Sequence, residues 1–78
     1  MPLAVYTIDQ QRESWAIALN GEPVETCQSL DVAVTASIRA GTLAHRMGFA
    51  CRVIINQRGA GHLLWADGQL MFEDALAA

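Results

Sequence analysis

A single helical segment divides this chain of 78 residues into two strand-rich halves. Ser29 is a typical N-cap residue, and Asp31 follows in the first turn, where the positive end of the helix dipole stabilises a carboxylate. Gly48 is expected to end the helix, because glycine readily adopts the left-handed conformation that follows a last turn. One helix covers only one face of a sheet, so a sheet built from the two halves is expected to keep a second face without a helix.

Apolar residues recur along this segment at the spacing of one helix face. The predicted buried stripe consists of Ala33, Ala36, Ala40, Leu43, Ala44 and Met47. The predicted solvent face consists of Asp31, Thr35, Arg39, Thr42 and Arg46. Because the inner face is mostly alanine, the helix is expected to lie close to its sheet.

Strand-forming residues fill both halves of the chain. The predicted strands are 3–8, 15–19, 24–27, 51–56, 62–66 and 70–72. Asn20-Gly21 and Asp67-Gly68 predict hairpin turns, because these residue types tolerate positive φ. The sequence therefore predicts one α+β domain over residues 1–78, with an antiparallel sheet of four to five strands, one helix on one face, and the order β-β-α-β-β.

The predicted strands carry more apolar residues than one buried face requires. Alanines alternate with larger apolar residues over 15–19, and residues 53–55 are apolar in succession, so both sheet faces are predicted to be partly apolar. Val34 and Ile38 lie on the flank of the helix. They either form part of an exposed apolar patch, which marks an interface, or are buried by a curled sheet. Self-association as a homodimer would cover the excess apolar area.

Charge is distributed unevenly along the chain, although the formal net charge is only −3. Between Val32 and Ala66 there is no Asp or Glu, and all eight acidic residues lie outside this stretch. The same stretch contains both histidines, His45 and His62. Because a local field steers a partner more than net charge does, this part of the chain is predicted to face a partner. Its arginines are Arg39, Arg46, Arg52 and Arg58.

Four side chains have the chemistry of zinc ligands, namely Cys27, His45, Cys51 and His62. No two of them have the spacing of two to four residues that is usual in structural zinc sites, so no metal site is predicted. A catalytic nucleophile needs a base within reach and a third group that orients the base, and only Cys51 with one of the histidines offers even a pair. The sequence therefore predicts no enzyme activity, no catalytic residue and no cofactor.

The longest apolar runs, 53–55 and 63–66, are far shorter than the roughly 20 residues that cross a bilayer. The first residues lack the basic and long apolar regions of a secretory signal, so the protein is expected in the cytoplasm. Its cysteines are expected to stay reduced there, and no contact with a membrane is expected.

Several features occur in one order: Trp15 to Ala18, the Asn20-Gly21 turn, Ser29 with Asp31, the helix alanines up to Ala44, Gly48, and a hydrophobic hairpin. In this order, which covers about two thirds of the chain, the sequence resembles the small bacterial DUF2188-type domains. The resemblance implies a fold of two strands, a helix and two strands. It implies no activity, because that family has none assigned.

The size, the absence of catalytic motifs and the single sheet are also similar in profile to phage-encoded anti-CRISPR inhibitors. Such proteins block a host complex by covering its nucleic-acid channel. This resemblance implies that acidic residues replace phosphates in a basic channel and that Arg39 and Arg46 engage carboxylates. The acidic residues concerned are Glu22, Glu25, Glu73 and Asp74.

Two classes of partner are compatible with the sequence. A nucleic acid would use the arginine-rich surface, but the net charge is negative, lysine is absent and no aromatic-rich strand is available for base stacking. A protein partner also explains the apolar excess. The predicted function is a non-catalytic protein-binding module, with the inhibitor as its most concrete form and nucleic-acid binding as the alternative. The predicted partner-binding residues are Val34, Ile38, Arg39, Arg46, Arg52 and Arg58.

Overall fold

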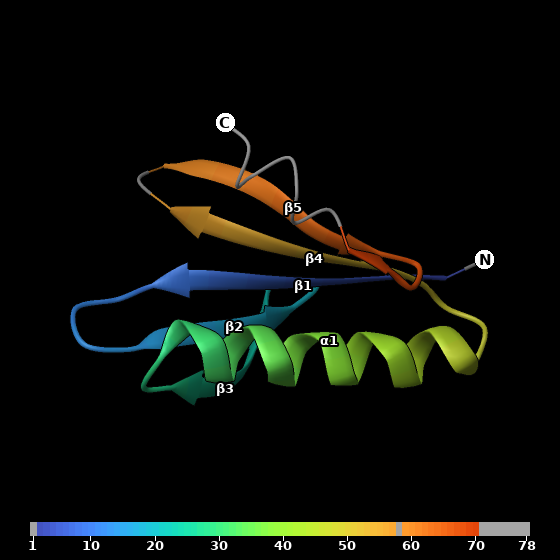
Figure 1. Ribbon diagram of the computed structural model, residues 1–78, viewed down its shortest axis with the longest axis horizontal. Coiled ribbons are helices and arrows are strands. Elements are labelled where there is room, and N and C mark those ends of the chain that lie inside the picture. The colour runs from blue at the N-terminus through green and yellow to red at the C-terminus, as the bar shows by residue number, and fades with distance from the viewer. Residues whose placement is uncertain (1, 58, 71–78) are drawn as a thin grey trace.

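The computed structural model describes residues 2–57 and 59–70, which form one sheet and one helix (Figure 1). Strands β1 (Leu3–Gln10), β2 (Trp15–Leu19) and β3 (Glu22–Cys27) precede the helix α1 (Leu30–Arg46). Strands β4 (Ala50–Gln57), β5 (Ala60–Ala66) and β6 (Gln69–Leu70) follow it. The predicted α+β class is confirmed. Of the strand predicted at 70–72, only the first residue belongs to the described part of the chain.

The six strands form one mixed sheet in the order β3-β2-β1-β4-β5-β6. β1 and β4 are parallel neighbours, whereas the other described neighbours are antiparallel. The prediction of an antiparallel sheet of four to five strands in the order β-β-α-β-β is therefore wrong in strand number, order and one strand direction. The cause is the helix, whose 17 residues span about 25 Å and return the chain to the end of the sheet where β1 begins. β4 then runs in the direction of β1 and pairs with it.

Both predicted hairpin turns are confirmed. Asn20 and Gly21 have φ values of 50° and 88°, and Asp67 and Gly68 have φ values of 47° and 92°. Positive φ at both central residues is typical of the type I′ turn, whose twist matches that of the flanking strands. The Asn20 side chain also attaches its turn to β1, because its Oδ1 accepts a hydrogen bond from the Val5 N–H at 2.9 Å.

The ends of α1 also lie where the sequence predicts them. The Ser29 Oγ accepts a hydrogen bond from the Val32 N–H at 3.2 Å, which satisfies one of the free donors of the first turn. Gly48 follows the last turn with a φ of 99°, a conformation that suits glycine. Within the predicted stripe, Ala33 is buried and Ala36, Ala40 and Ala44 are half-buried.

The buried face of α1 is nevertheless rotated from the predicted stripe. Leu43 and Met47 are 60% and 70% exposed, so their predicted burial is wrong. Ser37 and Gly41 are buried instead. The cause is Trp65 of β5, whose ring lies so close to Gly41 that an added Cβ would stand 2.9 Å from its Cζ3. Only small side chains fit where a helix approaches so closely, because protein interiors are densely packed.

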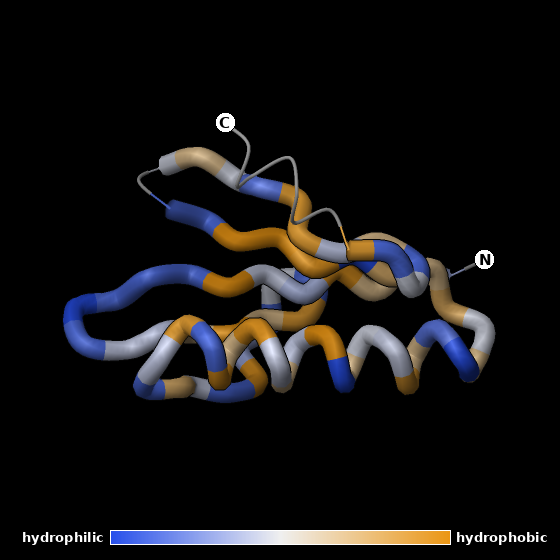
Figure 2. Tube along the Cα trace, viewed as in Figure 1, coloured by the Kyte–Doolittle hydropathy of each residue, from blue (hydrophilic) through white to orange (hydrophobic). Residues whose placement is uncertain are grey.

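The core lies between α1 and the sheet face that α1 covers. The buried apolar residues are Ala4, Ile8, Ile17, Cys27, Ala33, Cys51, Val53, Leu64 and Trp65. Figure 2 shows hydrophobic residues in the middle of β4 and hydrophilic residues in the loop between β1 and β2. Within the described residues, no helix combines the length and the apolar character needed to cross a membrane.

Candidate interaction surface

The sheet face opposite α1 is covered by no described element. At its centre, Thr7 of β1 lies level with Ala18 of β2 and with Ile54 of β4, and Ile54 lies level with Leu63 of β5. We define the open face as Val5, Thr7, Ala16, Ala18, Ile54 and Leu63. Leu63 is 41% exposed and the other five are half-buried. The prediction that both sheet faces are partly apolar is confirmed.

Two charged side chains stand at opposite ends of the open face. Asp9 leaves β1 on this face, and its Oδ1 accepts a hydrogen bond from the Asn56 Nδ2 at 2.8 Å. Arg52 leaves β4 on the same face, level with Val5. Asn56 and Arg52 are four residues apart on one strand, which corresponds to about 13 Å. The apolar centre of the open face therefore has an acid at one end and a base at the other.

Arg52 also belongs to a polar cluster at the end of β5. Its Nη1 donates hydrogen bonds to the Asp67 Oδ2 at 3.2 Å and to the Cys51 backbone oxygen at 3.0 Å. The Asp67 Oδ1 accepts a hydrogen bond from the Cys51 N–H at 2.7 Å and lies 3.8 Å from the His45 Nδ1. The Cys51 N–H, together with the charge of Arg52, holds the pKa of Asp67 below its ordinary value. Asp67 thus offsets part of the positive charge of the segment between Val32 and Ala66, which contains no Asp or Glu.

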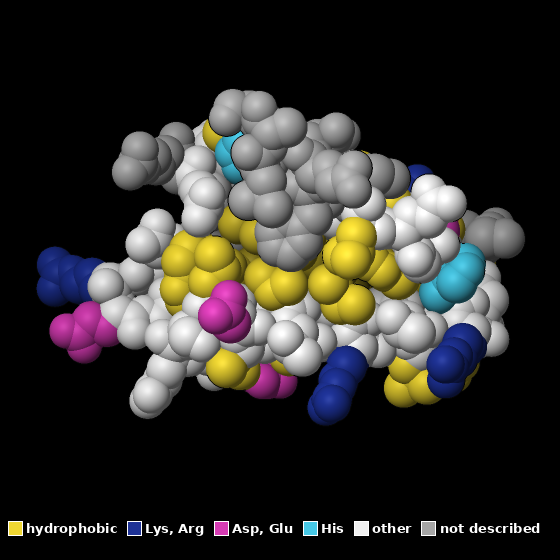
Figure 3. Space-filling view, viewed as in Figure 1, with side chains coloured by type: hydrophobic (Ala, Val, Ile, Leu, Met, Phe, Trp, Pro, Cys, Tyr) yellow, Lys and Arg dark blue, Asp and Glu magenta, His cyan; other side chains and the backbone are white. Residues whose placement is uncertain are grey.

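A second apolar area lies on the helix side, along the flank of α1 that faces β5. Gly41 on this flank lies so close to Trp65 of β5 that an added Cβ would stand 2.9 Å from the Trp65 ring. Val34 and Ile38 stand on the same flank at helical spacing, half-buried against the core. Figure 3 shows hydrophobic side chains gathered between α1 and the strands β4 and β5. For Val34 and Ile38, burial within the fold is therefore favoured over a freely exposed patch.

The arginines predicted to contact a partner differ in their surroundings in the described structure. Arg39 and Arg46 are exposed on α1. Arg52 leaves the sheet on the face opposite the helix. Arg58 lies outside the described residues. Because Arg52 is already bonded to Asp67, it is less available to a phosphate than Arg39 and Arg46.

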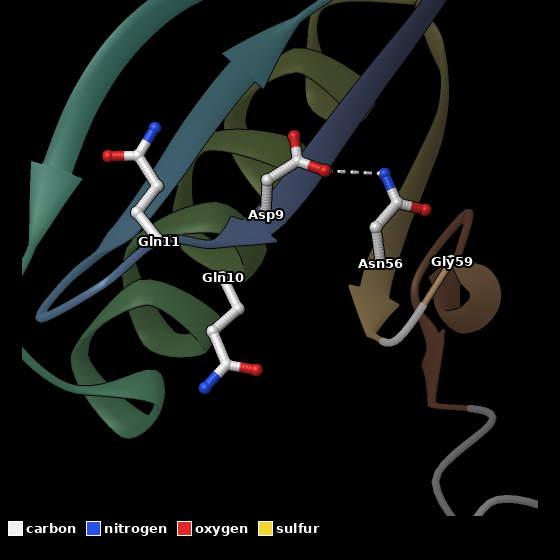
Figure 4. A pocket seen from close by; sticks show the side chains of 5 residues that line it. All are labelled: Asp9, Gln10, Gln11, Asn56 and Gly59. Atoms are coloured by element: carbon white, nitrogen blue, oxygen red, sulfur yellow. Dashed lines mark hydrogen bonds between the residues drawn. The ribbon is translucent and has the colours of Figure 1, made fainter.

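A shallow depression of about 620 Å³ lies at the Asp9 end of the open face. It is lined by Asp9, Gln10, Gln11, Asn56 and Gly59. Figure 4 shows Asp9 and Asn56 turned toward each other, whereas Gln10 extends away from them. The polar groups of a small-molecule site converge on one space, and these groups do not. The depression is therefore the polar margin of the open face.

Both cysteines are buried free thiols. Burial raises the pKa of the Cys27 thiol and the pKa of the Cys51 thiol. Each thiol is therefore held in its protonated, weakly nucleophilic form. Among residues 2–57 and 59–70, no three His, Cys, Asp or Glu side chains lie close enough together to hold a metal ion.

The edge strand β3 is poorly suited to pairing with a strand of another chain. Pro23 has no N–H to donate, and the pairing of β2 with β3 shifts register between Ile17 and Ala18. Glu22 and Glu25 are exposed on the same strand. Proline, irregular pairing and charge all oppose the addition of a strand at an edge. A partner is therefore better received on the open face than at this edge.

The sequence does not single out Thr7, Ile54 or Asp9 as site residues. They come together because β4 pairs with β1, which places Asn56 beside Asp9 across 47 residues of chain. A signal was available in the apolar run 53–55, because such runs are typical of strands contacted on both faces. That signal identifies a strand with two apolar faces but not its neighbours.

Comparisons of the chain with protein-family models, with curated proteins and with solved structures found no match. The resemblance to DUF2188-type domains and the similarity in profile to anti-CRISPR inhibitors therefore stay predictions.

Proposed function

We propose that this protein is a non-catalytic protein-binding module whose binding surface is the open face. The observation that carries the proposal is a central sheet with small and aliphatic side chains on a face that no described element covers. Contiguous apolar area left in contact with water is a mark of protein interfaces. The edge strand β3 is poorly suited to pairing with a strand of another chain, which supports binding through the open face instead.

The partner that fits this face is a protein surface that is flat and apolar at its centre. Thr7, Ala16 and Ala18 project little from the sheet, so they allow a second layer to approach to about 10 Å, the usual distance between packed sheets. Asp9 and Arg52 add one charge of each sign at the ends of the face. The partner is therefore expected to present a base and an acid at matching positions.

The inhibitor form of this function, in which the protein covers the nucleic-acid channel of a host complex, is retained within the proposal. Its support is the exposure of Glu22 and Glu25 on the edge strand β3, where acidic side chains are accessible to a basic channel. Glu73 and Asp74, which the resemblance also implicates, lie outside the described residues.

Nucleic-acid binding is the alternative from another class, and the geometry gives it less support. Its favourable feature is the exposed pair Arg39 and Arg46 on α1. Its unfavourable feature is that Arg52 is already bonded to Asp67. Phosphate contacts would make binding fall steeply with salt. Fluorescence anisotropy with short single and double strands is expected to show no binding at physiological salt.

Quantitative affinity capture from the native host tests the proposed surface with matched variants. Ile54→Glu places a charge at the centre of the open face, and Leu43→Glu places the same charge on an exposed position of α1. A partner of the open face is expected to be recovered with wild type and with Leu43→Glu but not with Ile54→Glu. The recovered protein is then purified and titrated against the same three proteins by calorimetry.

A second variant, Thr7→Lys, separates loss of binding from loss of folding. It adds a charge to the same face but replaces a polar residue, so it removes no apolar side chain from the fold. Circular dichroism first verifies that each variant is folded. Equal recovery of every captured protein by wild type, Ile54→Glu and Thr7→Lys would contradict the proposed surface.

A further inference from the structure

We infer that the occupant of the open face is a second copy of this chain, packed face to face around a two-fold axis. This inference rests on the proposed function and names its partner. A two-fold contact brings the same patch of both copies together, so the patch must be complementary to itself. The open face meets that condition in charge, because Asp9 and Arg52 stand at opposite ends of it, and its Thr7 and Ala18 project little from the sheet.

The position of the axis follows from the register of β1 and β4. A two-fold axis that lies in the interface, crosses the strands and passes over Thr7 and Ile54 reverses the strand direction in the second copy. The Asp9 end of one copy then lies over the Arg52 end of the other. Each dimer therefore contains two equivalent pairs of Asp9 with Arg52, related by the axis.

Asp9 and Arg52 both have hydrogen-bonding atoms left over for such a pair. Asp9 uses Oδ1 for the bond from Asn56, and Arg52 uses Nη1 for its bonds to Asp67 and to the Cys51 backbone. A guanidinium has five donors, so Nε and Nη2 of Arg52 remain able to donate to a carboxylate of the second copy. The Arg52 side chain is 39% exposed, which leaves it accessible.

The area available predicts a weak dimer. The four strands that carry the open face lie about 4.8 Å apart and are about 20 Å long, so they present roughly 400 Å² per copy, hence roughly 800 Å² in total. Stable interfaces usually bury about 1,200 to 2,000 Å², so this contact falls in the weak class. We therefore expect a concentration-dependent equilibrium between monomer and dimer in the micromolar range rather than a permanent dimer.

Sedimentation equilibrium over a concentration series from about 1 μM to about 1 mM tests the inference. Wild type and Leu43→Glu are expected to dimerise equally, whereas Ile54→Glu is expected to weaken the dimer at least about tenfold, because it buries two like charges at the axis. A wild type that stays monomeric to about 1 mM overturns the inference. Dimerisation that Ile54→Glu leaves unchanged overturns it as well.

Charge reversal at the two ends provides a sharper test. Asp9→Arg places Arg opposite Arg, and Arg52→Asp places Asp opposite Asp, so each variant alone is expected to weaken its dimer about tenfold. In a mixture of the two variants, every contact at the ends becomes an opposite pair. The mixture is therefore expected to form a heterodimer with a Kd within about threefold of that of wild type.

Misfolding of either variant cannot produce this rescue, because two disrupted chains do not restore one interface. A mixture no stronger than its components overturns the two-fold arrangement. A monomeric wild type combined with a captured protein that Ile54→Glu loses overturns the second-copy inference but leaves the proposed function standing. A monomeric wild type with equal capture by all variants overturns both.

Discussion

The two faces of the sheet differ in how their apolar residues are used. The closed face packs against α1 and includes Ile8, Val53 and Trp65, which are 0%, 0% and 3% exposed. The open face has aliphatic residues in Val5 and Ile54, yet these stay half-buried. The difference teaches that apolar content alone does not identify the core of this protein, because the position of the single helix decides which face becomes core.

The largest expected effect contrasts one side chain from each face. Trp65→Ala removes a buried indole from the closed face and is expected to lower the free energy of unfolding by about 3 to 5 kcal/mol. Leu63→Ala removes a side chain that is 41% exposed and is expected to cost about 1 kcal/mol. Urea unfolding of both variants, with fixed protein concentration, measures the two values. Equal costs would show that the two faces do not differ in this way.

A smaller effect is expected where α1 approaches Trp65. Gly41→Ala introduces a Cβ at 2.9 Å from the Trp65 Cζ3, and overpacking of this kind costs about 1 to 3 kcal/mol. The higher helix propensity of alanine offsets about 1 kcal/mol of that cost. The net expectation is a destabilisation of about 1 kcal/mol.

A double-mutant cycle with Trp65→Phe isolates the contact between these two residues. Phenylalanine lacks the second ring of the indole, so Gly41→Ala is expected to become neutral or stabilising in that background, with a coupling of about 1 kcal/mol. Additive effects of the two substitutions would mean that the ring does not limit the approach of the helix.

A substitution at Ser37, on the side of α1 that faces the sheet, is expected to raise the stability of the fold rather than lower it. The Ser37 Oγ is buried and has no hydrogen-bond partner within the described part of the chain. An unsatisfied hydroxyl costs about 1 to 3 kcal/mol, so Ser37→Ala is expected to stabilise the fold by about 1 kcal/mol. Thr35→Ala, at an exposed position of α1, reports the contribution of helix propensity alone. A destabilised Ser37→Ala would indicate that the hydroxyl makes a bond within the fold.

The smallest effect concerns Asp67, which accepts hydrogen bonds from the Cys51 N–H and from the Arg52 side chain. Its pKa is depressed in the folded state, so its contribution is present above the unfolded pKa of about 3.9 and is lost as pH falls through the folded pKa. The advantage of wild type over Asp67→Asn in urea midpoint is therefore expected to hold from pH 7 to about 5 and to shrink below about 4.

Arg52→Gln serves as the second variant in this pH series. The Cys51 N–H is the main cause of the depressed pKa, so the loss of stability at low pH is expected to persist without the guanidinium. A pH dependence that disappears in Arg52→Gln would assign the depression to the ion pair instead.

Local features of the fold are predictable from the sequence because they depend on residues close in the chain. The Ser29 cap, the Gly48 stop and the two turns at Asn20 and Asp67 follow from which φ values and hydrogen bonds each residue type accepts. The apolar excess of the strands likewise follows from period and composition. The sequence by itself thus determined the helix, the turns, the α+β class and the expectation of a second apolar face.

Only the tertiary structure decided which strands are neighbours and which way the helix is turned. The parallel pairing of β1 with β4 brings Asp9 to Asn56 across 47 residues, and Gly41 is buried where Trp65 approaches the helix. The physical reason is that strand order and helix rotation are set by the packing of distant side chains. Such packing leaves no trace in local periodicity.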